Sequence, residues 1–295
     1  MMRRHATAAL AALGVLIPVA AGAFPDDPGA RALAMGGAGR ADARADEGPR
    51  LNPAGMALAR VYTVEGAYQL ITRDQGQTGR VAIVDSTSEF KLAMGIFYAY
   101  RFASPTGVSR LGAHEGGVSA AYPFGETVAI GVTGKYLRLT GGVPEADGSD
   151  RHTGVTVDVG ATIRAASVLT LGVVGYNLHD LSTAAAPVAI GYGAALLPMP
   201  DLVVVADAFH DFTTSDPTRG VRTTVGAGVE YVAQRRFVAR AGGGHDGGSG
   251  HAYVSAGFAG VAEVGAIEIG ARQDVTGDRK LSFVSVGLRL FVASP

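Results

Sequence analysis

Residues 153–164 read TGVTVDVGATIR, and this stretch decides the fold class. Valine, alanine and isoleucine occupy every second position of it, whereas smaller or polar residues occupy the positions between them. Successive side chains of a β-strand point to opposite faces, so the stretch predicts a strand with one apolar and one polar face. The same alternation returns in Lys91–Phe102, Val221–Tyr231 and Val284–Val292.

The connections between such segments alternate between short turns and longer loops. Short turns are expected at Asp85–Ser88, Pro123–Glu126, Ala165–Ser167, Pro198–Pro200, Gln234–Arg235 and Ala262–Glu263. Longer loops are expected between them, at Arg73–Gly79, Ala103–Gly112, Gly141–Arg151, Asp180–Ala186, Thr213–Gly220, Gly243–Gly250 and Asp274–Arg279. Bacterial outer-membrane barrels alternate tight turns with longer loops in this way, and residues 61–295 hold about fourteen such strands. We therefore predict an all-β protein, a closed transmembrane antiparallel β-barrel.

Composition excludes several classes of function. The chain has 295 residues, 43 of them glycine, no cysteine, 17% charged residues and a net charge of −1. Without cysteine there is no disulfide and no thiolate metal site, and a chain without clustered positive charge is not expected to bind nucleic acid. The sequence contains no G-x-S-x-G, H-E-x-x-H or P-loop motif, so we expect neither an enzyme nor a cofactor.

Residues 1–23 have the pattern of a secretory signal peptide. Arg3 and Arg4 precede an apolar run from residue 6 to residue 20, and the small residues of Ala21-Gly22-Ala23 form a cleavage site. Pro18 near the end of the run argues against the alternative of an uncleaved membrane anchor. We expect a mature chain in the bacterial outer membrane, surrounded by lipid. A soluble periplasmic β-protein is the other possibility that the sequence leaves open.

The segment before the first strand, residues 24–60, carries a different pattern. Small residues dominate GARALAMGGAG at 29–39, and Asn52, Pro53, Ala54 and Gly55 form a turn shortly before the first strand. Proline disfavours the helical region for the residue before it, so Asn52 is expected to fix a bend. The segment resembles the start of the FadL-like outer-membrane proteins, which include the long-chain fatty-acid transporter and the PorV/PorQ-like barrels. The resemblance implies a small plug, or hatch, inside a fourteen-stranded barrel.

Two functions follow from the resemblance. The first is passive uptake or binding of small hydrophobic molecules; the alternative is a PorV/PorQ-like scaffold that transports nothing and serves an envelope protein partner. The longest expected loop, Gly141–Arg151, is polar, which argues against capture of long acyl chains. Glycine weakens strand ladders, so the glycine-rich segments Val168–Asn177 and Val254–Gly260 are candidates for kinks through which ligands leave the lumen sideways.

The polar faces of the expected strands give the candidate site. These side chains carry both signs of charge, which predicts ion pairs that pack the lumen or hold the plug. The candidate lumen residues are Lys91, Arg101, Lys135, Asp158, Arg164, Asp207, Arg222, Glu230, Glu268 and Arg272. Three His-Asp pairs lie at the ends of alternate strands, at the expected outer rim; they begin at His179, His210 and His245. Alternate strands lie about 10 Å apart, so we predict no metal site there.

Overall fold

The computed structural model describes residues 29–72, 76–104, 111–140, 151–183, 186–216, 220–278 and 280–292. The expected signal peptide, residues 1–23, lies outside the described residues. So does most of the expected loops Ala103–Gly112 and Gly141–Arg151.

Fourteen antiparallel strands form one closed barrel, as the alternation predicts. Each strand pairs with its neighbours in the sequence, and the last strand closes against the first with Thr63 opposite Phe291. The closed ring leaves no open sheet edge, whose unpaired backbone N–H and C=O groups could find no partner in lipid. The strands are β1 (Tyr62–Ile71), β2 (Gly76–Asp85), β3 (Ala93–Ala103), β4 (Leu111–Phe124), β5 (Val128–Thr140), β6 (Arg151–Ala166), β7 (Leu169–Tyr176), β8 (Ala189–Met199), β9 (Leu202–Asp216), β10 (Gly220–Ala233), β11 (Phe237–Asp246), β12 (His251–Ala262), β13 (Gly265–Asp274) and β14 (Ser282–Phe291).

The alternation in the sequence separates an outer from an inner face. On β3, Met94 and Ile96 are 50% and 52% exposed on the outside, whereas Phe97 and Ala99 are buried inside. Apolar side chains cover the outer face in the same way on β6, β10 and β14. An apolar outer band around a closed barrel is typical of a transmembrane β-barrel. In the described ranges no helix has the length and apolar character needed to cross a bilayer.

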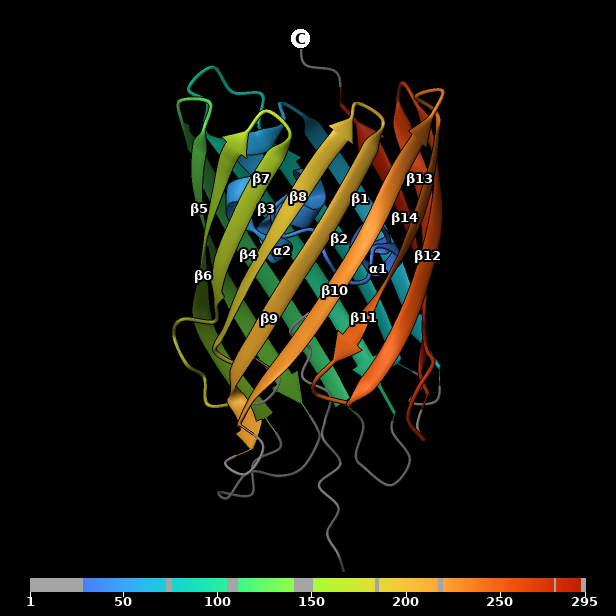
Figure 1. Cartoon of the computed structure of the whole chain (residues 1–295). Helices are drawn as coiled ribbons and strands as arrows, with labels where there is room; N and C mark the ends of the chain where they lie inside the picture. Colours follow the sequence, from blue (N-terminus) through green and yellow to red (C-terminus); the bar gives the residue numbers. More distant parts are fainter. Residues whose placement is uncertain are drawn as a thin grey trace, which may run out of the picture.

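The two ends of the barrel differ. Turns of two or three residues close β4–β5, β6–β7, β8–β9, β10–β11 and β12–β13 at the end where β14 finishes, which is uppermost in Figure 1. We call this the turn end and the opposite end the loop end.

The expected alternation of loop lengths is wrong at two connections. The β2–β3 connection, expected as a short turn, spans 86–92, and β9–β10, expected as a long loop, spans only 217–219. The side chain of Asp85 accepts hydrogen bonds from the N–H and hydroxyl of Thr87, which favours a turn over a longer strand. β9 instead continues to Asp216 through a pair of threonines, which suit strands.

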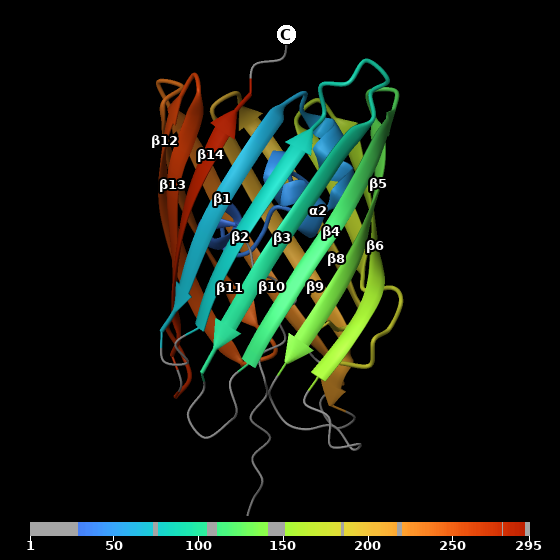
Figure 2. The ribbon, with the colours of Figure 1, turned by 180° about the vertical axis from the view of Figure 1, so that it is seen from behind.

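Residues 29–58, called here the inner segment, lie inside the barrel in the half nearer the turn end (Figures 1 and 2). The segment is a string of short helical turns whose alanines are almost all buried. Small side chains let the backbone fit within the confined lumen. The turns are α1 (Ala30–Ala34), η1 (Ala45–Glu47), α2 (Gly48–Leu51) and η2 (Pro53–Leu58), of which η1 and η2 are 3-10 helices.

Candidate functional site: the inner segment and the barrel wall

Asn52 joins the inner segment to the barrel wall. Its backbone is extended, as expected for a residue before proline, and its side-chain oxygen accepts a hydrogen bond from the N–H of Ala54 at 3.1 Å. The side-chain nitrogen donates to the carbonyl oxygen of Arg40 at 2.8 Å and to Thr162 Oγ1 on β6 at 3.2 Å. Asn52 is completely buried. One side chain therefore caps η2, ties two parts of the inner segment together and attaches both to the wall.

Glycines in the wall leave room for this motif. Gly131 on β5 lies directly opposite Gly160 on β6. A Cβ atom at Gly131 would lie 2.4 Å from the carbonyl carbon of Pro53, and one at Gly160 would lie 2.1 Å from the side-chain oxygen of Asn52. The inner segment thus approaches the wall at a distance that only glycine permits.

We expect Gly160→Val to displace the inner segment, because the new side chain overlaps the place of Asn52. The cost should be about 1–3 kcal/mol in the free energy of unfolding, as for other overpacked sites. The measurements are the melting temperature of the folded barrel and the rate at which a protease cuts residues 29–58.

Gly134→Val on β5 is the matched control, since a Cβ at that outward position meets no described atom within 4 Å. Equal effects of the two substitutions would show that the inner segment does not rest on Gly160.

Arg31 is the centre of a buried charge cluster. Its guanidinium contacts Asp42 at 2.7 Å and Glu47 at 3.0 Å within the inner segment, and Glu230 on β10 at 2.9 Å. Burial raises the pKa of Glu47, although the charge of Arg31 acts in the opposite direction. Glu230 in turn pairs with Arg240 on β11 at 2.7 Å. The cluster binds α1 to two wall strands.

Arg40 makes a second attachment. Its guanidinium lies 3.1 Å from Asp207 on β9, and the backbone N–H groups of Gly39 and Arg40 both donate to the same carboxylate oxygen at 2.8 Å. The guanidinium also donates to the hydroxyl of Tyr176 at 2.9 Å and lies over the ring of Phe209 at 5.2 Å. Arg40 is only 2% exposed. A buried pair of this kind is costly to break, because either partner alone would be an unpaired buried charge.

Further ion pairs attach the inner segment elsewhere around the ring. Arg50 contacts Glu115 on β4 at 3.2 Å, and Asp46 contacts Arg289 on β14 at 2.7 Å. With Glu230 and Asp207, the wall partners lie on β4, β9, β10 and β14. The inner segment is therefore held from several sides of the barrel.

The structure brings several of the expected lumen residues together inside the barrel. Lys135 and Asp158 form an ion pair at 2.7 Å, and Arg101 pairs with Glu115 at 2.9 Å. Arg222 and Arg272 are half-buried on the inward faces of β10 and β13. The expected lumen residues that are buried are Arg101, Lys135, Asp158, Asp207, Glu230 and Glu268.

Two expected lumen residues lie elsewhere. Lys91 was placed on the inward face with Arg101 by alternation, but the strand begins at Ala93, and Lys91 is exposed in the β2–β3 connection. That assignment is therefore wrong. Arg164 keeps the inward alternation of β6, but it lies next to the turn end and is exposed.

The sequence pattern missed the charges of the inner segment and two of their wall partners, Glu115 and Arg289. Arg31 and Arg40 stand in a small-residue stretch that has no strand alternation, so no inward face was assignable to them. Glu115 and Arg289 do lie on alternating strands, β4 and β14, and the polar faces of those strands point to them.

The histidines do not form a metal site among the described residues, where no group of three or more potential ligands occurs. His210 instead contacts Tyr192 at 3.0 Å and Thr223 at 2.9 Å, and His251 contacts Asp274 at 3.2 Å. The imidazoles of His210 and His251 thus each have hydrogen-bond partners near the loop end.

The barrel wall is shortest, measured along the strands, at β7 and β8. β6 has sixteen residues but β7 has only eight, and the described ladder between them runs from Val159 to Ala166. β8 begins at Ala189, opposite Asp211, so the last part of β9 also extends beyond it. The loop-end half of β6 and the last five residues of β9 therefore face a notch in the wall.

The described parts of the β7–β8 connection, residues 177–183 and 186–188, lie at this notch. Two hydrogen bonds tie this connection to β6, from Leu178 N to Val157 O and from Thr156 Oγ1 to His179 O, each at 2.9 Å. Leu181 is buried against Leu137 inside the barrel. This notch loop, as we call it, seals the wall mainly with an apolar side chain and a few hydrogen bonds, rather than with a strand ladder.

Comparison with solved structures identifies the fold. A structure described as the CymD monoaromatic hydrocarbon channel matches with a TM-score of 0.68 at 13% identity, covering 90% of this chain and 97% of that one. The toluene transporter TodX of Pseudomonas putida matches with a TM-score of 0.68 at 12% identity over the same shares. A FadL homologue of Pseudomonas aeruginosa matches with a TM-score of 0.63 at 11% identity, covering 89% of this chain and 98% of that one. The chain has the fold of the FadL-like barrels.

No protein-family model and no curated protein matches the sequence. The likeness is one of architecture.

Proposed function

We propose that the chain is a bacterial outer-membrane channel through which small hydrophobic molecules diffuse passively. The observation that carries the proposal is the fold: a closed fourteen-stranded barrel shared with structures described as a monoaromatic hydrocarbon channel and a toluene transporter. The apolar outer face, seen at Met94 and Ile96, supports a place in the outer membrane.

The lumen argues against a wide, water-filled pore. The inner segment occupies the half nearer the turn end, and ion pairs from Arg31 and Arg40 hold it to the wall. A hydrophobic molecule that follows the barrel axis would meet this charged region, which is an unfavourable place for it.

A sideways route avoids the charged region. The notch between β6 and β9 lies on the loop side of the inner segment, and the notch loop closes it with the apolar Leu181. We propose that the ligand enters at the loop end and leaves through this notch into the membrane. The short strand β7 (Leu169–Tyr176) lies within the glycine-rich segment Val168–Asn177, for which the sequence predicts a sideways exit.

The alternative of a PorV/PorQ-like scaffold with an envelope protein partner receives no support from the comparisons. It predicts a sealed lumen and no uptake.

Uptake into liposomes tests the proposal. Refolded mature chain should admit toluene and a short aromatic dye at a rate well above that of empty liposomes. Heat-dependent migration on a gel provides the control that the barrel has folded. A folded barrel that admits neither compound, and leaks only when residues 29–58 are removed, would overturn the channel in favour of the scaffold.

A further inference from the structure

A continuous row of side chains on the outer face runs across six strands from β14 to β5. The strand register makes each member the direct neighbour of the next. Its apolar part lies on β14 and β1, and its polar part lies on β4 and β5. In order, the row is Val286, Tyr68, Gly79, Tyr100, His114 and Arg138.

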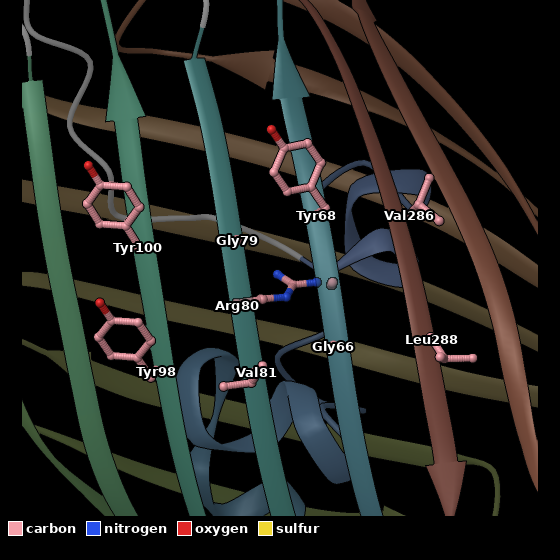
Figure 3. A pocket seen from close by; sticks show the side chains of 10 residues that line it. Gly66, Tyr68, Gly79, Arg80, Val81, Tyr98, Tyr100, Val286 and Leu288 are labelled. Carbon is pink, nitrogen blue, oxygen red and sulfur yellow. The ribbon is translucent and has the colours of Figure 1, made fainter.

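A hollow of about 560 Å³ lies at the apolar part of this row. Its floor has no side chain at Gly66 and Gly79, and Tyr68, Tyr98 and Tyr100 stand around it (Figure 3). A Cβ atom at Gly66 would meet no described atom within 4 Å. Because the hollow opens on the apolar outer face, the surrounding hydrocarbon is what fills it in a membrane.

The other part of the row is basic. The imidazole of His114 packs against Tyr100 in a tilted arrangement, with ring centroids 4.7 Å apart, and its Nδ1 lies 2.7 Å from the hydroxyl of Tyr98. Arg138 lies directly across from His114, is exposed, and is close to Thr140, where β5 reaches the loop end. Arginine is the side chain best suited to a phosphate group, which it binds through two parallel hydrogen bonds.

The row runs from the middle of the barrel toward one end, as a lipid does from its acyl chains to its headgroup. The strands are tilted, as Figure 2 shows for β1 to β5, so a row across them descends from the middle of the barrel at β14 toward the loop end at β5. An acyl chain lying in the hollow would therefore have its headgroup at the loop end, beside Arg138.

We propose that this row is a binding site for a phosphorylated lipid of the outer leaflet. One acyl chain lies over Gly66 and Gly79, and a phosphate group contacts His114 and Arg138. The inference rests on the membrane placement proposed above but not on what the lumen conducts. The site lies on the opposite face of the wall from the inner segment.

Native mass spectrometry of the folded barrel in detergent tests the site, with diphosphoryl lipid A as the probe and lipid A without its two phosphate groups as the comparison lipid. Gly66→Leu and Gly79→Leu fill the hollow. Gly260→Leu on β12 is the matched control, because a Cβ there also meets no described atom within 4 Å.

We expect the two hollow-filling substitutions to weaken lipid A binding at least about fivefold, or about 1 kcal/mol, whereas the control leaves it unchanged. A second pair, His114→Gln with Arg138→Gln, should weaken binding of diphosphoryl lipid A but not of the comparison lipid without phosphate. Arg236→Gln, an exposed arginine at the turn end, is the control for that pair.

Equal binding of the two lipids by the unmodified barrel, or no loss in the filled variants, would overturn the proposal. The uptake assay separates it from the proposed channel. If the unmodified barrel takes up toluene but does not distinguish the two lipids, only the lipid site is contradicted. If it binds lipid A selectively but takes up nothing, only the channel is contradicted.

Discussion

A cross-link between the notch loop and β6 should reduce uptake of toluene at least about tenfold, because the exit then cannot open. The chain contains no cysteine, so a Gly154→Cys, Leu181→Cys pair would be its only thiols. A Cβ at Gly154 lies 2.5 Å from a methyl carbon of Leu181 and 3.3 Å from its Cγ, so the two backbones are close enough for a bond between the new side chains.

Liposome uptake is measured before and after oxidation, and again after reduction. Each single-cysteine variant, treated in the same way, is the control for the loss of Leu181 or Gly154. Recovery of uptake on reduction is the expected result. An oxidised pair that transports as fast as the reduced one would place the exit somewhere other than the notch.

Asp207→Ala should release the inner segment and open the lumen to ions. The substitution leaves the buried guanidinium of Arg40 and the N–H groups of Gly39 and Arg40 without their shared acceptor. Removal of one partner from a buried ion pair typically costs about 3–5 kcal/mol, most of it from the charge left unpaired. We expect larger and noisier conductance in planar bilayers than for the unmodified barrel, and faster proteolysis of residues 29–58.

The double variant Asp207→Ala, Arg40→Met separates charge from packing. It removes the unpaired charge, so it should be milder than Asp207→Ala alone. Asp201→Ala, an exposed aspartate in the β8–β9 turn, is the control for general loss of an acidic group. Conductance of Asp207→Ala equal to that of the control would mean that Arg40 does not hold the inner segment.

The outer surface was the most predictable part of the molecule. Alternation in residues 153–164 assigns each side chain of β6 to a face, because lipid on one side and the lumen on the other impose opposite demands. The number of strands followed from the same pattern. Loop lengths were less predictable, since local hydrogen bonds such as those of Asp85 with Thr87 decide where a strand stops.

The inner segment was harder to predict in detail. Asn52-Pro53 marked its bend, but the pairing of Arg31 with Glu230 joins residues 199 positions apart, and no local pattern specifies such a contact. The glycines were visible but ambiguous. Gly131 and Gly160 become informative only when the register places them side by side beneath Asn52 and Pro53.

The inner segment also bears on the order of assembly. It precedes β1 in the chain, yet it contacts β4 through Arg50, β6 through Asn52 and β10 through Arg31. Contacts between residues so distant in sequence form slowly, since long loops must first be closed. In a ring already sealed at β1 and β14, these side chains would have to enter the confined lumen through one of its ends. We therefore expect the inner segment to take its place before the β1–β14 seam closes, so that the later strands pair around it.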